Sequence, residues 1–570
     1  MGCCASAATS AASAAVQLPS SLVSYFPSIE DFLKNSKVCF LELPSAVAYA
    51  LQVSVAVVGI CRVKHRVVAG LTPEKCQSGE PLTGDLEAAF RKGITDLHAK
   101  GACVITGDTG FMMWYQAMAR ESTKLPVILS SLACLPTITC SYSKEEQVAI
   151  FTTSVKTLER MEGLLRAECG VSIHDTRYVF VGIDEIPGFE SIALGQHAES
   201  RTMEAGLCQK AAEVLEQHPK VRAFLLECNE LPRYADALRR ATGRPVFDAM
   251  KLCDFYIDSL LDNPRFGIKD WDDALNKKSA EFDFGQSLSA ATQLITKPVL
   301  LARDVALQVY AASMQHAVSM MVRSRRQGIK LGVVRLDYHY EPAPGDVDHP
   351  GSYAYEVHYQ MVPGLTFELC QSGKMTQEVE VELLKAIGAL ESKGVSVITG
   401  DCGFMMWYQE LVRTSTRLPV IMSSLATLPA ITSSFHKGEQ VAIFTANGKS
   451  LLPMEELIKA ECAVDLKDER YVFVGCEDIP GFEAVALGEK VDVRKVTPGM
   501  VKKAQDVLRD HPKVRAFLME CTELPPYSDA VRHATGLPVF DAITACDFYI
   551  SSHLDNVKMA VDLSNPFWLV

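Results

Sequence analysis

The sequence has 570 residues, more than one hydrophobic core usually holds, so it predicts several domains. Its composition, 48% hydrophobic and 22% charged, is typical of globular proteins with ample material for cores. The formal net charge of −13 argues against nucleic acid as a partner, because phosphate binding needs a basic surface.

The chain begins with "MGCCAS", which suits N-myristoylation of Gly2 and palmitoylation of Cys3 and Cys4. Two lipid groups would hold a soluble protein on a membrane, so we expect a targeting or acylated segment at residues 1–52. The alternative is a plastid transit peptide, because the start of the chain is rich in Ala and Ser and contains no acid. Its lack of basic residues fits that class poorly. The expected location is therefore intracellular, in a plastid or lipid-anchored at a membrane.

Two copies of one long segment follow. The stretch from His218 is "HPKVRAFLLECNELPRYADALRRATGRPVFDA", and it returns from His511 as "HPKVRAFLMECTELPPYSDAVRHATGLPVFDA". From Gly101 to Tyr256 the copies align without a gap at a constant offset of 293 residues. Each copy has the size of a whole domain, which indicates tandem duplication rather than a solenoid.

Within each copy, strand-like and helix-like segments alternate. In the second copy, strands are expected in "GVSVIT", "LPVIMSS", "EQVAIFT", "RYVFVG" and "KVRAFLME", and a helix in "FMMWYQELVRTST". This alternation predicts an α/β fold with two doubly wound parallel-sheet lobes per unit, and an active site at the lobe interface. We expect a first unit at residues 53–266, a helical linker at 267–328 and a second unit at 329–570.

The units differ upstream of the aligned region. From Leu331 the second unit reads "LGVVRLDYHYEPAPGDVDHPGSYAYEVHYQMVPGLTFELCQSG", whereas the first has only "VVGICRVKHRVVAGLTPEKCQSG". The first unit is therefore expected to lack an equivalent of residues 337–354, here called the tyrosine loop. This Pro/Gly-rich stretch carries Tyr338, Tyr340 and Tyr353, and loops of this kind often close over a ligand.

One nearly identical stretch distinguishes the units chemically. It reads "VITGDTGFMMWYQ" and "VITGDCGFMMWYQ", and it differs only where Thr109 faces Cys402. Cys402 and Cys521 each follow a predicted strand and precede a helix, at the end of the sheet where α/β proteins bind ligands. Helix N-termini there would lower the thiol pKa. Two such thiols would flank one substrate carbon, one taking a proton and one giving it; Asp401 and Thr522 lie beside them.

Most of the eighteen cysteines need no special role. They show no zinc-ribbon spacing, so we expect reduced, mostly buried thiols. Cys76, Cys370, Cys462 and Cys546 are assigned to this inert class.

Four motifs of the second unit resemble those of the algal dimethylsulfoniopropionate (DMSP) lyases of the Alma type, which are similar to the aspartate/glutamate/hydantoin racemase superfamily. They are "RLDYHYEPAPGDVDHP", "VPGLTFELCQSG", "GDCGF" and "ECTELPPY". The resemblance implies a cofactor-independent carbon–sulfur lyase that cleaves DMSP to dimethyl sulfide and acrylate. It also implies that Cys402 and Cys521 are the catalytic thiols. In the first unit these positions fall on Thr109 and Cys228.

The implied chemistry suits these residues, because removal of a proton beside a carboxylate needs a desolvated base. A threonine hydroxyl does not ionise near neutral pH, so Thr109 would leave the first unit degenerate. Aromatic rings would suit the sulfonium cation, and hydroxyl groups its carboxylate. The candidate substrate contacts are Tyr338, Tyr340, Tyr353, Trp407, Asp401, Thr522, Ser423 and Ser424, although the helix aromatics and the serines equally suit packing and loop roles.

Two alternative functions remain open at this point. Opposed thiols also suit a racemase of amino acids or hydantoins that works without pyridoxal phosphate. A non-catalytic, membrane-associated binding protein is the other alternative. We expect no cofactor and no metal, because "GDVDHP" around Asp346, Asp348 and His349 is more typical of an ordinary loop. We expect a homo-oligomer that acts on a small molecule.

Overall fold

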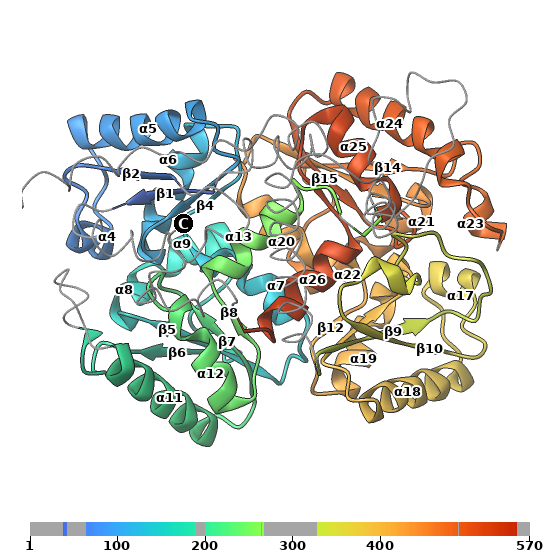
Figure 1. Ribbon diagram of the computed structural model, residues 1–570, viewed down its shortest axis with the longest axis horizontal. Coiled ribbons are helices and arrows are strands. Elements are labelled where there is room, and N and C mark those ends of the chain that lie inside the picture. Colours follow the sequence, from blue (N-terminus) through green and yellow to red (C-terminus); the bar gives the residue numbers. More distant parts are fainter. Residues whose placement is uncertain are drawn as a thin grey trace, which may run out of the picture.

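The computed structural model describes residues 38–42, 64–189, 200–263, 265–266, 328–487 and 489–555. Gly2, Cys3 and Cys4 lie outside the described residues, as does nearly all of the expected linker. In the described part of the chain the strands form four sheets, each with four parallel strands (Figure 1). This confirms the α/β fold class and the arrangement of two lobes per unit.

The second unit contains two sheets of the same topology, ordered β10-β9-β11-β12 and β14-β13-β15-β16. Their strands are β9 (Lys330–Arg335), β10 (Glu356–Met361), β11 (Val397–Gly400), β12 (Val420–Ile421), β13 (Gln440–Thr445), β14 (Tyr471–Gly475), β15 (Val514–Met519) and β16 (Val539–Phe540). In each sheet the strand order reverses between the first and third strands, β9/β11 and β13/β15. Such switch points open a crevice at the carboxyl ends of the strands.

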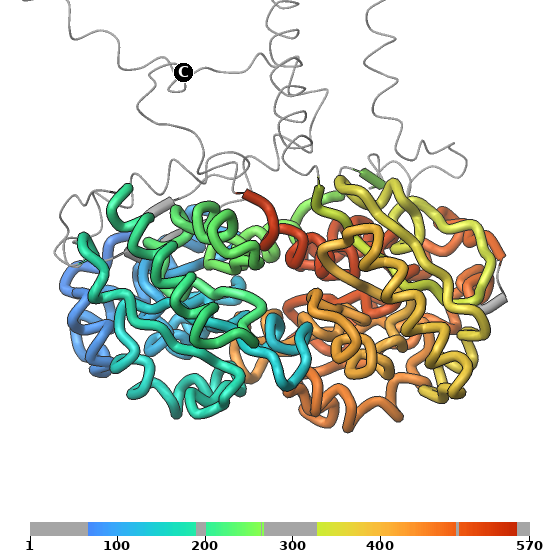
Figure 2. Tube along the Cα trace, turned by 90° about the horizontal axis from the view of Figure 1, so that it is seen from below, coloured from blue at the N-terminus to red at the C-terminus, as the bar shows by residue number. Residues whose placement is uncertain are grey.

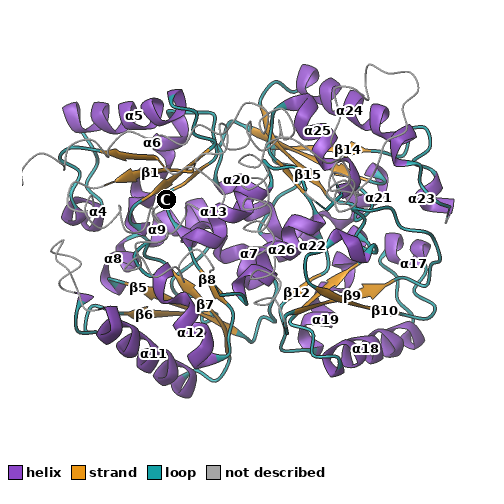
Figure 3. Ribbon diagram, viewed as in Figure 1, coloured by secondary structure: helices purple, strands orange, loops and turns teal. Residues whose placement is uncertain are grey.

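Helices cover these sheets on both faces, as Figure 3 shows. They are α17 (Phe367–Ser372), α18 (Gln377–Ser392), α19 (Gln409–Ser415), α20 (Leu428–Ser433), α21 (Gly448–Leu451), α22 (Glu455–Cys462), α23 (Ala484–Leu487), α24 (Val493–Asp510), α25 (Ser528–Thr535) and α26 (Ala542–Ser552). The helix expected in "FMMWYQELVRTST" is α19 preceded by a 3₁₀ helix, η6 (Gly403–Tyr408).

The first unit repeats this architecture, with sheet orders β2-β1-β3-β4 and β6-β5-β7-β8. Its strands are β1 (Val38–Glu42), β2 (Lys64–Val67), β3 (Val104–Gly107), β4 (Val127–Ile128), β5 (Gln147–Thr152), β6 (Tyr178–Gly182), β7 (Val221–Leu226) and β8 (Val246–Phe247). Its helices are α4 (Pro73–Ser78), α5 (Gly84–Ala99), α6 (Gln116–Glu121), α7 (Leu135–Cys140), α8 (Val155–Arg160), α9 (Glu162–Cys169), α11 (Ser200–Gln217), α12 (Ala235–Thr242) and α13 (Ala249–Asp258).

Strand β1 corrects the expected start of the first unit. It pairs with β2 and β3, yet it lies inside the segment 1–52 that we assigned to targeting. Residues 43–63 therefore connect β1 to β2, as residues 336–355 connect β9 to β10. The expectation that the first unit lacks a connection of this length is therefore wrong. The connection in the first unit differs in composition, because residues 43–63 contain no acidic residue and only one tyrosine.

The two units pack against each other with pseudo-twofold symmetry, side by side along the longest axis (Figure 2). The amide of Val127 donates to the carbonyl of Ser434 at 3.0 Å, and that of Val420 donates to Ser141 at 2.9 Å. Both partners in the second bond are offset by 293 residues from those in the first. Such reciprocity is the signature of an isologous interface, here contained in one chain.

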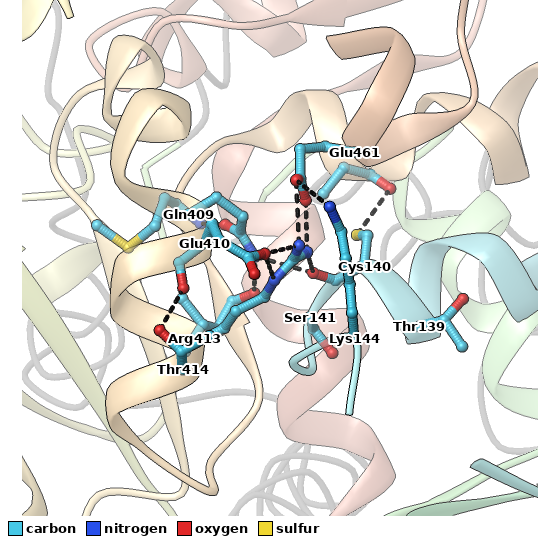
Figure 4. A network of polar contacts seen from close by, with 12 residues as sticks. Thr139, Cys140, Ser141, Lys144, Gln409, Glu410, Arg413, Thr414 and Glu461 are labelled. Atoms are coloured by element: carbon cyan, nitrogen blue, oxygen red, sulfur yellow. Dashed lines mark hydrogen bonds and ion pairs between the residues drawn. The ribbon is translucent and has the colours of Figure 1, made fainter. Parts of the chain in front are cut away.

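Arginine side chains reinforce this interface. The guanidinium of Arg413 donates to the carbonyl of Cys140 at 2.9 Å and pairs with Glu461, while all of these groups are buried (Figure 4). Arg120 makes the matching bond to the carbonyl of Ser433 at 2.7 Å. Helices α7, α13, α20 and α26 form the apolar centre of the contact. Among the described residues, no helix is both long enough and apolar enough to span a bilayer.

Candidate active site

Two strand ends bring the predicted thiols to the crevice of the second unit. Cys402 follows β11 and is the N-cap of η6, and Cys521 follows β15 after one residue. Both side chains are buried, 2% and 4% exposed. A hydrogen bond with Cys370 and burial raise the pKa of the Cys402 thiol most, and Glu523 and Cys521 add smaller electrostatic contributions, so the two thiols lie within electrostatic range across the lobe interface.

Close contacts join the two lobes at this place. The hydroxyl of Thr522 donates to the carbonyl of Asp401 at 2.5 Å, and the carbonyl of Thr522 accepts from the amide of Val347 at 3.2 Å. A Cβ added to Gly403 would lie 1.8 Å from the Oε1 of Glu520, so only glycine fits there. The side chain of Thr522 is thus in contact with the backbone of Asp401, both of them predicted site residues.

Four buried carboxyl groups form a cluster that reaches Cys521 through Glu523. They belong to Asp346, Asp348, Asp401 and Glu523. Arg335 faces them, at 2.8 Å from Asp348 and 3.9 Å from Asp401. Burial and neighbouring carboxylates raise the pKa of Asp346 and Asp401 well above the ordinary range, and burial raises that of Asp348 to about 6. The site is therefore a buried, acid-rich cluster whose raised pKa values favour the protonated form of the carboxyl groups.

The thiols themselves are held protonated, contrary to the expectation of a lowered pKa. The Cys521 thiol donates to the Oε2 of Glu523 at 2.6 Å, and burial and the Glu523 charge raise its pKa well above 9. A hydrogen bond with Cys370, together with burial, raises the pKa of Cys402 likewise. The helices that begin after these thiols are short 3₁₀ segments of six residues (Gly403–Tyr408) and three residues (Pro525–Tyr527) beside carboxylates, so their dipoles are outweighed.

The tyrosine loop lies against this cluster. The Tyr340 hydroxyl donates to the Oδ2 of Asp346 at 2.8 Å, and its ring lies 5.2 Å from that of Tyr338. Tyr338 stacks on Phe367, and its hydroxyl donates to the carbonyl of Val485 in the other lobe. These contacts extend the loop across both lobes.

Tyr353 lies at the far end of the loop. Its side chain is buried, and its hydroxyl donates to the carbonyl of Val347 at 2.9 Å. It therefore fixes the conformation of the loop, while contact with a substrate stays a prediction for all three tyrosines.

The remaining predicted contacts hold the fold together in both units. Trp407 covers Gly373 as Trp114 covers Gly79, since a Cβ on either glycine would meet the indole. Ser423 caps the amide of Leu425 at 3.3 Å.

Ser424 donates to the carbonyl of Met519 at 3.2 Å, as Ser131 does to that of Leu226 at 2.9 Å. Since the first unit repeats these bonds, they do not distinguish an active site, and substrate binding by Trp407, Ser423 and Ser424 stays a prediction.

Comparison with known proteins supplies the family. No family model matches the chain. It is 36% identical over 527 residues to dimethylsulfoniopropionate lyase 5 of Emiliania huxleyi (strain CCMP1516), covering 89% of this chain and 97% of that protein. The chain belongs to the dimethylsulfoniopropionate lyase family. The chain is also 56% identical over 242 residues to dimethylsulfoniopropionate lyase 3 of the same strain. This match covers 42% of this chain and 63% of that relative.

A further lyase, from Durusdinium sp. clade D, is 54% identical over 233 residues, which are 41% of this chain and 77% of that one. Among solved structures, an aspartate racemase homologue from Pyrococcus horikoshii OT3 matches at 14% identity and a TM-score of 0.26, over 39% of this chain and 96% of that one. Unliganded arylmalonate decarboxylase matches at 19% identity and a TM-score of 0.27, over 39% of this chain and 91% of that one. Scores of this size carry no argument.

In this member of the lyase family the equivalent place in the first unit is altered. Cys228 donates to Glu230, as Cys521 does to Glu523. Thr109, however, replaces the second thiol, and Asn229 bonds the carbonyl of Gly107 where Thr522 bonds Asp401. The described part of the first unit thus keeps one thiol–carboxylate pair and lacks the other thiol.

Sequence reasoning missed several groups of the candidate site. Glu523 follows Cys521 by two residues, and that spacing in "ECTEL" was a usable signal. Cys370 was assigned to the inert core, yet its thiol is hydrogen-bonded to that of Cys402. Arg335 ends β9 with no local signal of its role. Within the described residues no group of His, Cys, Asp and Glu is arranged to hold a metal ion.

Proposed function

We propose that the second unit cleaves DMSP to dimethyl sulfide and acrylate, and that Cys402 and Cys521 form its acid/base site. The observation that supports this most is the convergence of two buried thiols from the switch points of two adjoining sheets. Membership in the lyase family supplies the substrate class.

The reaction needs one base and no co-reactant. A thiolate takes the proton from the carbon beside the carboxylate, and the electron pair of that C–H bond becomes the carbon–carbon double bond of acrylate. The bond between sulfur and the adjacent carbon breaks, and its electron pair leaves with dimethyl sulfide. The thiol then gives that proton to water, which restores the thiolate.

The acid-rich cluster suits the cationic end of the substrate. Arg335 lies against Asp348 and Asp401, while Asp346 and Glu523 add further buried carboxyl groups, so a sulfonium would find a complementary field. The ring of Tyr340 would add a cation–π contact of about 0.5–2 kcal/mol. A bound cation also stabilises a nearby thiolate, so the substrate itself lowers the pKa that burial has raised.

Cys521 is the better candidate for the base. Its thiol already donates to a carboxylate, Glu523, which is the arrangement that activates a nucleophile or base. The Cys402 thiol instead bonds the thiol of Cys370, and it would stay protonated and donate a hydrogen bond to the substrate as negative charge builds beside the carboxylate, because the elimination consumes no proton. The carboxylate of the substrate would lie toward Arg335 and the hydroxyl of Thr522.

The test is release of dimethyl sulfide from DMSP by the purified full chain. We expect Cys402→Ala and Cys521→Ala each to abolish release, whereas Cys228→Ala leaves it within about twofold, because the first unit lacks the second thiol. An active Cys402→Ala variant would contradict the two-thiol mechanism. Equal loss in Cys228→Ala would show that the first unit is catalytic. Racemisation of aspartate, glutamate or hydantoins without dimethyl sulfide release would favour the racemase alternative.

Membrane association through acylated Gly2, Cys3 and Cys4 and a homo-oligomeric state are also proposals. Myristate and palmitate labelling of the chain in cells, with Gly2→Ala as control, tests the first. The mass of the purified chain by light scattering tests the second, since one chain has 62.4 kDa.

A further inference from the structure

The first unit ends in a segment that lies on the second unit. After α13, the carbonyl of Ser259 accepts a hydrogen bond from the Nε of Arg532 at 2.8 Å. The carboxylate of Asp262 lies 2.8 Å from the Nε2 of His533 and 3.3 Å from Arg532. These polar contacts carry the chain across the boundary between the units.

Two further contacts fix the direction of this segment. The amide of Asn263 lies 3.2 Å from both carboxyl oxygens of Asp529. The guanidinium of Arg265 pairs with Asp547 at 2.8 Å, and both side chains are only about one-fifth exposed. The segment is therefore bound to the second unit up to Arg265, the residue directly before Phe266.

That next residue, Phe266, packs on the tyrosine loop of the other unit. Its side chain is 2% exposed. A Cβ added to Gly345 would lie 2.8 Å from the Cδ2 of the Phe266 ring and 3.0 Å from the Cα of Pro526. Gly345 has a φ of +103°, so this point of the loop is a tight turn held between a ring from the first unit and a proline of the second.

A short series of hydrogen bonds connects the contact between Phe266 and Gly345 to the thiols. The Gly345 amide donates to the Oγ of Ser352 at 2.9 Å, and Ser352 donates to the carbonyl of Asp346 at 2.6 Å. The Asp346 carboxyl accepts from Tyr340, and its pKa is raised by burial and then by the charge of Glu523, which accepts the hydrogen bond of Cys521. A shift of Gly345 would therefore move Tyr340 and the acids relative to the thiols.

We propose that Phe266 of the degenerate first unit is a positioning residue for the active site of the second, acting through Gly345 of the tyrosine loop. The expected kinetic effect rests on the proposed lyase function, whereas the contact between Phe266 and Gly345 is independent of that function. It also gives the first unit a role that does not require its own catalysis. The polar contacts are repeated by symmetry, as when Arg239 donates to the carbonyl of Ser552 at 2.8 Å, whereas the acids that Phe266 supports occur in the second unit alone.

Phe255 provides a matched control. It is a buried phenylalanine of the same unit, 3% exposed, and its ring neighbours in the second unit are Phe540 at 4.9 Å and Phe548 at 5.2 Å. Replacing either phenylalanine by alanine leaves a cavity of similar size at the boundary between units. Only Phe266 supports the tyrosine loop.

The experiment compares Phe266→Ala, Phe266→Leu and Phe255→Ala in the full chain. We expect Phe266→Ala to raise the KM for DMSP about tenfold with a smaller fall in kcat, Phe266→Leu to recover most of this loss, and Phe255→Ala to leave KM unchanged while lowering the melting temperature as much. Equal KM effects in Phe266→Ala and Phe255→Ala would overturn the proposal.

Hydrogen exchange at residues 337–354 gives a readout that does not depend on lyase activity. We expect faster exchange in the tyrosine loop of Phe266→Ala than in Phe255→Ala, at temperatures where both variants remain folded by circular dichroism. If the loop exchanges equally in both, the proposal fails whatever the substrate. If the loop loosens but the wild-type chain releases no dimethyl sulfide, the proposed function fails and the positioning contact stands.

Discussion

The thiol of Cys521 lies 2.6 Å from the carboxylate of Glu523, two residues further along the chain, and donates its proton to it. The same pair recurs in the first unit as Cys228 and Glu230. One thiol–carboxylate pair is therefore common to both units, and the second thiol is what separates them.

The first prediction concerns pH. The pKa of Cys521 is raised by burial and then by Glu523, so a thiolate base becomes more populated as the pH rises. We expect kcat/KM to increase from neutral toward alkaline pH. Glu523→Gln removes the negative charge, which should move the rising limb to lower pH while reducing the maximal rate about tenfold or more, because the proton acceptor is lost. A limb that stays in place would show that Cys521 is not the group titrating.

The second prediction uses a pair of matched glycines. Gly403→Ala and Gly110→Ala each place a methyl group 1.8 Å from a buried glutamate oxygen, of Glu520 and Glu227 respectively. Both variants should lose stability to a similar degree. Only Gly403→Ala should lose activity, by about 100-fold, because displacement of about 1 Å at a reacting group costs that much. The test is to measure dimethyl sulfide release and chemical unfolding of both variants. Equal loss of activity would contradict the proposal that only the second unit is catalytic.

The third prediction links Glu520 to stability. Burial raises its pKa from 4.5 to about 7. Between these values the folded chain keeps a proton that the unfolded chain loses, so stability is complete below pH 4.5 and falls as the pH rises, by about 3 kcal/mol in all.

Glu520→Gln should flatten this decline in unfolding free energy between pH 5 and 7. Burial raises the pKa of Glu227 to about 8, so Glu227→Gln should flatten the decline in unfolding free energy over a wider pH range. An unchanged slope in both variants would show that these acids ionise in the folded chain.

The fourth prediction concerns the interface between units. Arg413 and Glu461 are 1% and 4% exposed, so removal of one partner leaves a buried charge. We expect Arg413→Ala to cost about 3–5 kcal/mol of unfolding free energy, and Arg120→Ala, which breaks the symmetric pair with Glu168, to cost a similar amount. The double variant Arg413→Met/Glu461→Leu should cost much less. Urea unfolding measures all of these; a cost below 1 kcal/mol for Arg413→Ala would mean that water reaches the pair.

Local sequence was sufficient for most of the fold. Buried strands such as β11 and β15 are short β-branched runs between helices, and that alternation allows few arrangements other than parallel sheets. Strand β1 was missed because "VCFLE" has little similarity to "KLGVVR", and only pairing with β2 and β3 identifies it. The duplication itself is a property of sequence alone.

For the site, the sequence by itself determined which unit carries two thiols and that both follow strands, because strand ends and their order are encoded locally. Only the tertiary structure decided the charge of those thiols, since pKa depends on spatial neighbours such as Cys370 and Glu523 and on burial. It also placed Phe266 against Gly345, two residues that are far apart in the chain and meet only where the first unit packs on the second.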